Sequence, residues 1–130
     1  MWIYLVRHGD AAPGEPDDER RLTPEGREQA RRLGRRLAGA QPAPGAVLHS
    51  PVGRARETAE LMAAALGLQP EPDDRLAPGS TAADVRAAAA DRGDAVVVVG
   101  HQPDCGRIAA ALTGGPEPAF PAGGMVVMEL

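Results

Sequence analysis

Short apolar runs alternate with segments of helical periodicity along this chain of 130 residues. Four such runs predict strands: Trp2 to Val6, Ala46 to His49, Ala95 to Val99, and Met125 to Leu130. The valines at 96–99 form a continuous β-branched run, which is typical of a strand buried on both faces of a parallel sheet. We therefore expect this strand at the centre of the sheet.

Apolar residues recur at helical spacing between the predicted strands. Four helices are predicted: from the cap pair Thr23–Pro24 to Gly39, from the cap pair Ser50–Pro51 to Gly67, from about Thr81 to Asp91, and from Pro103 to about Leu112. Segments rich in Pro, Gly and Asp predict surface loops at 12–20, 69–79 and 114–124. The alternation predicts one domain over 1–130, a three-layer α/β sandwich with a mostly parallel central sheet flanked by helices.

Basic and imidazole side chains follow three of the predicted strands. Arg7 and His8 end the first strand, and His101 follows the valine run. Arg54 comes after the second strand, in the first turn of a predicted helix, where free backbone N–H groups already favour an anion. Ligands of such sheets bind beyond the carboxyl ends of the strands, so these side chains predict a basic pocket there.

The composition excludes several classes of protein. The formal net charge is -4, so the basic excess of nucleic-acid and membrane-surface proteins is missing. One Trp, one Tyr and one Phe leave little material for base-stacking platforms. All 14 basic residues are Arg, whose planar fork binds phosphate or carboxylate through two parallel hydrogen bonds, although genomic base bias also explains this usage. We expect a partner that is neither nucleic acid nor membrane.

The single cysteine, Cys105, excludes an intrachain disulfide and favours a reducing compartment. No apolar run approaches the ~20 residues of a membrane span, and the first residues lack the basic start of a signal peptide. We therefore expect a cytoplasmic protein.

Four motifs occur in order: L-V-R-H-G at 5–9, L-T-P-E-G at 22–26, S-P-x-x-R-A-x-E-T at 50–58, and V-G-H at 99–101. In this order they resemble the histidine phosphatase superfamily, which is phosphoglycerate mutase-like in fold. The R-H-G-D-A start, the small size, and the R-R-L-T-P-E-G and G-H-Q-P-D stretches are most similar to the SixA-type phosphohistidine phosphatases of that superfamily.

The resemblance implies a role for each matching residue. His8 would be the nucleophile, its tautomer set by a backbone carbonyl, and would form a covalent phosphohistidine intermediate. Arg7, Arg54 and a protonated His101 would hold the phosphoryl oxygens. Arg20 either reaches the phosphate from the first loop or is an exposed loop charge. No cofactor motif and no metal-ligand cluster is found, so we expect a metal-independent hydrolase without a cofactor.

No carboxylic acid clearly matches the general acid that many superfamily members carry. The candidates are Asp10, Asp17, Asp18, Asp73, Asp74 and Asp104. An imidazole leaving group, with a free pKa near ~6.5, departs with far less help than an alcohol would need. A site without an acid therefore favours a phosphohistidine substrate, and the short loops favour an open site that admits a phosphorylated protein.

Other readings remain. The partner could be a small-molecule phosphate, hydrolysed by a phosphomonoesterase of the same fold, or the pocket could belong to a non-catalytic phosphate-binding regulatory module. A cysteine-dependent phosphatase is excluded because Arg107 follows Cys105 too closely to leave a phosphate-binding loop. A metallophosphatase is disfavoured because His8 and Asp10 have no further ligand cluster around them in the sequence.

Overall fold

A five-stranded sheet organises the protein, for which the computed structural model describes residues 1–130. The strands are β1 (Trp2–Arg7), β2 (Ala46–His49), β3 (Pro70–Pro72), β4 (Ala95–Gly100) and β5 (Met125–Glu129). Their order is β3-β2-β4-β1-β5, and all pairs are parallel except β1 with β5. The valine strand β4 lies at the centre, as its continuous apolar run predicts.

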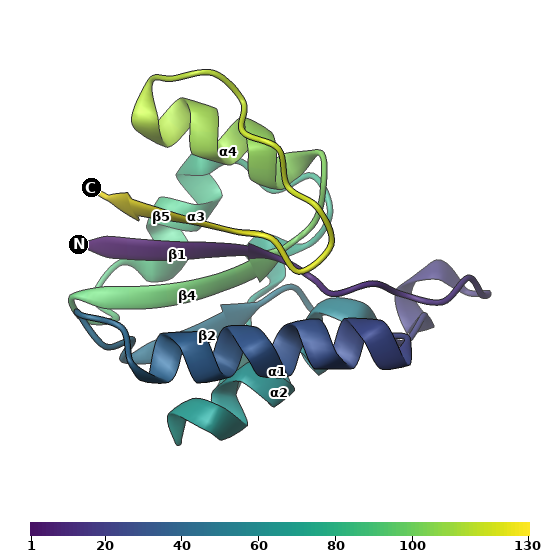
Figure 1. The fold of residues 1–130 in the computed structure, drawn as a ribbon. Coiled ribbons are helices and arrows are strands. Elements are labelled where there is room, and N and C mark those ends of the chain that lie inside the picture. The colour runs from purple at the N-terminus through teal and green to yellow at the C-terminus, as the bar shows by residue number, and fades with distance from the viewer.

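Helices cover both faces of the sheet (Figure 1). They are α1 (Pro24–Ala38), α2 (Gly53–Leu66), α3 (Ala82–Ala89) and α4 (Asp104–Thr113), with two short 3-10 turns at Asp17–Glu19 and Asp74–Leu76. Helices α1 and α2 pack on one face, while α3 and α4 pack on the other. The predicted three-layer α/β architecture is confirmed. No helix combines the length and the apolar character that a membrane crossing requires.

Alternating strand residues divide the core into two clusters, one on each face of the sheet. Val96 and Val98 of β4 pack with Val85 of α3 and Ile108 of α4. The intervening Val97 and Val99 join the cluster of α1 and α2. A strand with apolar residues at every position is thus stable only between two helical layers.

Strand β3 was missed by the sequence analysis, which assigns its residues to a loop. Pro70 and Pro72 make the segment resemble a loop, because proline cannot donate to a sheet ladder. The strand lies at the sheet edge and pairs with β2 through Val47 and His49. An edge position tolerates proline, since one side of the strand needs no partner.

The predicted helix starts are confirmed for α1 and corrected for α2. Thr23 caps α1 by accepting a hydrogen bond from the Gly26 amide at 3.0 Å, with Pro24 in the first helical position. The second helix begins at Gly53 with Val52 as its N-cap, and not at Ser50. The Ser50 amide instead bonds to the Val99 carbonyl and continues the pairing of β2 with β4. Its hydroxyl therefore does not cap the helix.

Candidate active site

The carboxyl ends of β1 and β4 bring His8 and His101 together. The His8 amide donates to the Gly100 carbonyl at 3.1 Å, which extends the pairing of the two strands by one residue. The two imidazole rings are both buried, and their centroids lie 5.4 Å apart with a tilt of 59°. Two side chains 93 positions apart in the sequence therefore lie side by side, as the sheet topology predicts.

A backbone carbonyl fixes the tautomer of His8. Its Nδ1 lies 2.7 Å from the Gly9 oxygen, and because a carbonyl can only accept, Nδ1 must carry the hydrogen. The neutral ring then presents an unprotonated Nε2. Burial lowers the pKa of His8 from 6.5 to about 4, and the positive charges of Arg54, Arg7 and Arg20 add to this effect against the Gly9 bond. The ring is thus neutral and nucleophilic at neutral pH.

Arg7 and Arg54 both lie close enough to His8 to depress its pKa. Arg7 donates from Nη1 to the Phe120 carbonyl at 2.9 Å, while its buried Nε has no hydrogen-bond partner. Arg54, in the first turn of α2, is almost fully buried and donates to the Asp17 carbonyl and, at 3.3 Å, to the Asp17 carboxylate. Both guanidinium groups are held in place by the protein itself.

His101 is oriented by Ser50. The Nε2 of His101 lies 2.8 Å from the Ser50 hydroxyl, and its buried Nδ1 has no partner. Burial lowers the pKa of His101 from 6.5 to about 4, with smaller contributions from His8 and Arg54. The ring is therefore neutral in the free protein, whereas the resemblance implies a protonated His101 when the phosphoryl group is bound. A bound phosphate anion beside the ring would raise its pKa.

Arg20 is anchored within the first loop. Its Nε donates to the Ala12 carbonyl at 2.8 Å, Nη2 to the Ala11 carbonyl at 3.3 Å, and Nη1 to the Asp17 carboxylate at 3.2 Å. Each of its nitrogens thus has a loop partner, and the charge acts on His8 through space. A direct contact of Arg20 with phosphate stays a prediction.

Of the six aspartates considered as general acid, Asp17 is the one tied to the pocket arginines. Its carboxylate pairs with both Arg20 and Arg54, and these cations lower the pKa of Asp17. Three of the others are engaged elsewhere. Asp10 accepts from the Thr23 hydroxyl at 2.8 Å, Asp73 pairs with Arg75, and Asp104 accepts from the Gly79 amide. Asp17 is therefore ionised at neutral pH and poorly suited to give up a proton.

Three residues make positioning contacts that the sequence does not predict: Ser50, which the pattern indicates only as a helix cap, and Glu57 and Thr58, which it contains only as part of a motif. The Thr58 hydroxyl accepts from the Gly9 amide at 3.0 Å and donates to the Arg54 carbonyl at 2.8 Å. The Glu57 carboxylate accepts from the Leu22 amide and from the side chains of Arg21 and Arg27. The signal available in the sequence was the presence of polar residues in and just before the first turns of the second predicted helix.

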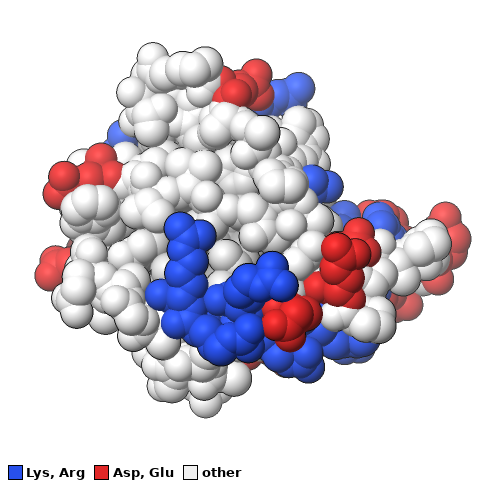
Figure 2. All heavy atoms as spheres, in the orientation of Figure 1, with Lys and Arg blue, Asp and Glu red and all other residues white.

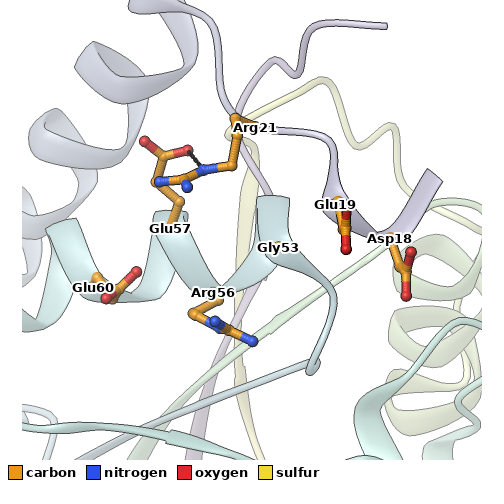
Figure 3. Close-up of a pocket in the computed structure, with 7 residues that line it drawn as sticks. All are labelled: Asp18, Glu19, Arg21, Gly53, Arg56, Glu57 and Glu60. Atoms are coloured by element: carbon orange, nitrogen blue, oxygen red, sulfur yellow. Dashed lines mark hydrogen bonds and ion pairs between the residues drawn. The ribbon is translucent and has the colours of Figure 1, made fainter. Parts of the chain in front are cut away.

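A hollow of about 610 Å³ lies beside the candidate site and is separate from it (Figure 3). It is lined by charged side chains of the first loop and α2, with Arg21 and Glu57 paired across it. Neither histidine of the pocket lines it, and neither do Arg7 and Arg54. No three His, Cys, Asp or Glu side chains of the protein gather in a geometry that could hold a metal ion.

His8, His101 and Arg7 thus lie at the carboxyl ends of β1 and β4, beside Arg54 in the first turn of α2. The model of the histidine phosphatase superfamily (branch 1) matches residues 3–78, and the chain belongs to this superfamily. An uncharacterised protein of Picosynechococcus sp. is 39% identical over 125 residues, which cover 88% of this chain and 74% of the relative. The protein is thus a phosphatase of the superfamily.

Comparison with solved structures identifies a group within the superfamily to which the chain is similar. The protein histidine phosphatase SixA in complex with tungstate has 28% sequence identity and a TM-score of 0.84, covering 99% of this chain and 95% of that one. A SixA from Agrobacterium tumefaciens, described as a candidate phosphohistidine phosphatase, has 27% identity and a TM-score of 0.82, covering 98% and 90%. The fold is phosphoglycerate mutase-like, and the chain is SixA-like within the superfamily.

Proposed function

We propose that the protein is a protein phosphohistidine phosphatase and that His8 is its nucleophile. The observation that carries this proposal is the bond from His8 Nδ1 to the Gly9 carbonyl, which leaves Nε2 unprotonated beside Arg7, Arg54 and His101. The similarity to SixA, a protein histidine phosphatase that was solved with the oxyanion tungstate, supports the substrate class.

The proposed reaction has two displacements at phosphorus. In the first, the lone pair of His8 Nε2 forms a P–N bond while the bond from phosphorus to the substrate imidazole breaks, and that imidazole leaves neutral because its other ring nitrogen already carries a proton. In the second, water attacks phosphorus, the bond to His8 breaks, and inorganic phosphate leaves. Arg7, Arg54 and His101 would stabilise the charge on the equatorial oxygens throughout. The unpartnered Arg7 Nε is a suitable donor, and His101 Nδ1 is one in the tautomer in which the Ser50 hydroxyl donates to Nε2.

The carboxylates around the pocket support an imidazole leaving group. Asp17 pairs with Arg20 and Arg54 and is ionised, so it offers no proton to a departing alkoxide. An imidazole with a pKa near ~6.5 needs little such help. We expect phosphohistidine to be hydrolysed orders of magnitude faster than alkyl phosphates. The proposal includes independence from metal ions, and dialysis against EDTA should leave the rate unchanged.

The test compares initial rates on a phosphohistidine peptide, a phosphoserine peptide and an aryl phosphate. Brief reaction with the radioactively labelled phosphohistidine peptide, followed by alkaline denaturation, should trap an acid-labile, alkali-stable label on the protein. His8→Ala should abolish both the label and the turnover. Retention of near wild-type turnover by this variant would refute the nucleophile, and a preference for the phosphoserine peptide would refute the substrate class.

His49→Ala is the matched control. His49 is also buried, and its Nδ1 also lies 2.7 Å from the carbonyl of the following residue, Ser50. Its pKa is lowered by burial and by Arg56, and not by the arginines around His8. The same local geometry thus occurs at the end of β2 without the same cationic surroundings. This variant should keep forming the labelled intermediate.

A further inference from the structure

A basic patch covers the exposed face of α1. Four of its arginines are exposed: Arg31, Arg32, Arg35 and Arg36. Figure 2 shows positive side chains gathered over this helix, bordered by a broad uncharged surface over β1 and β5. Arg35 pairs with Glu28 at 2.9 Å, and the other three form no ion pair. Although the net charge of the chain is -4, its α1 surface therefore carries positive charge that no carboxylate pairs with.

Two adjoining hollows border this patch. The first, of about 270 Å³, lies between α1 and the segment before β5, and its lining includes Arg32, Arg36 and Gly123. The second, of about 280 Å³, is mostly apolar, with Trp2, Tyr4, Met125 and Val127 among its lining residues. Arg36 lines both hollows, so the two are neighbours along α1, and we refer to them together as the groove. Val127 is 44% exposed, which leaves apolar surface open on edge strand β5.

The groove begins beside the catalytic histidine. Gly123, in the lining of the first hollow, donates from its amide to the His8 carbonyl at 3.0 Å. Gln29, at the same end, accepts from the Asp10 amide at 2.8 Å. From Gln29 to Arg36 the helix rises by ~10 Å, the reach of about three residues of extended chain. A peptide bound at His8 could therefore run directly into the groove.

We infer that this groove, lined by Arg32, Arg36, Trp2, Met125 and Val127, docks an acidic segment of the phosphoprotein substrate. The inference rests on the proposed function. Carboxylates three to six residues from the phosphohistidine face Arg32 and Arg36, and an apolar side chain beyond them fills the second hollow. Two arginines beside an apolar hollow favour a polypeptide segment that carries both acidic and apolar side chains.

The test uses three substrates: free phosphohistidine, a phosphohistidine peptide followed by Glu, Asp and Leu residues, and a peptide of equal length with Lys in place of the acids. The wild-type protein should favour the acidic peptide in kcat/KM over the lysine peptide, and added salt should reduce the difference. The double variant Arg32→Glu, Arg36→Glu should lower kcat/KM for the acidic peptide about tenfold, because each reversal replaces attraction by repulsion. Free phosphohistidine should be hydrolysed as before.

A charge-matched control is the double variant Arg86→Glu, Arg107→Glu on α3 and α4, where both side chains are exposed on the opposite helical layer. It should leave the peptide preference intact.

Equal rates on both peptides, or a loss shared by the control, would overturn the docking site while leaving the phosphatase proposal standing. Absence of hydrolysis of all three substrates by the wild-type protein would overturn the proposed function itself. Inhibition of acidic-peptide hydrolysis by a DNA duplex, removed by the α1 variant with free phosphohistidine unaffected, would assign the groove to nucleic acid instead.

Discussion

The Nε2 of His101 and the hydroxyl of Ser50 lie 2.8 Å apart, and both side chains are buried. The Ser50 hydroxyl also accepts from the Val52 amide at 3.3 Å, in the segment that enters α2. A hydrogen bond at one ring nitrogen fixes the orientation of the imidazole and the role of the other nitrogen. Ser50 is thus a positioning residue, which connects the end of β4 to the start of α2.

Replacing Ser50 with Ala should reduce kcat/KM about tenfold while the protein stays folded, because the imidazole of His101 loses its partner and its fixed orientation. Steady-state kinetics over pH is the measurement. A purely structural role would lower stability and leave the shape of the pH profile unchanged. Wild-type kinetics in the variant would show that the bond has no part in catalysis.

The contact of Asp17 with Arg54 predicts an effect on oxyanion binding. The Asp17 carboxylate competes with an anion for this guanidinium, so Asp17→Asn should lower the inhibition constant of vanadate several-fold, most clearly at low salt. Asp18→Asn is the control, because Asp18 lines the separate hollow of about 610 Å³ beside the site. If Asp17→Asn instead slowed turnover of an alkyl phosphate and spared phosphohistidine, Asp17 would be a general acid, contrary to its pairing in the structure.

The sequence predicted the two histidines and two arginines together because each follows a strand of the same sheet. Strand ends in a parallel sheet share one edge, so the positions of Arg7, His8, Arg54 and His101 follow from the topology. The continuous valine run likewise indicated the central strand, since both its faces are apolar. These inferences needed only local periodicity and the rules of parallel sheets.

Contacts between loops and distant helices carry no such signal. Asp17 reaches Arg54 across 37 positions, from a loop whose conformation no periodic pattern indicates. The hydrogen bond between Ser50 and His101 spans 51 positions. A serine before a proline is also typical of a helix N-cap, so the sequence does not indicate this contact. The depressed pKa of His101 in the free protein depends on burial in three dimensions, which no local sequence pattern indicates.

The buried histidines predict a pH dependence of both ionisation and stability. The pKa of His8 and that of His101 fall from 6.5 in the unfolded chain to about 4, so the unfolded state binds more protons between these values. Stability should therefore be full above pH 6.5 and decline as the pH falls towards 4. Thermal unfolding across this range checks the stability, and NMR of the three histidines checks the ionisation. A pKa of His8 near 6.5 would contradict the conclusion that burial lowers it.

The close approach of Gly26 to Asp10 predicts that the first turn of α1 positions the loop behind His8. A Cβ added at Gly26 would lie 2.0 Å from the backbone oxygen of Asp10, and one at Gly9 would lie 2.5 Å from the Gly26 oxygen. Because both obstacles are backbone, Gly26→Ala must displace the loop or the helix, and it should cost about 1–3 kcal/mol of stability or more. Activity should fall further than this loss of folded protein explains, since Gly9 directly follows His8, the proposed nucleophile. Gly39→Ala, at the open end of the same helix, has no neighbouring atom closer than 3.9 Å and should be nearly neutral. Urea unfolding and kcat of the two variants measure the contrast, and equal behaviour of both would refute the role of the close approach.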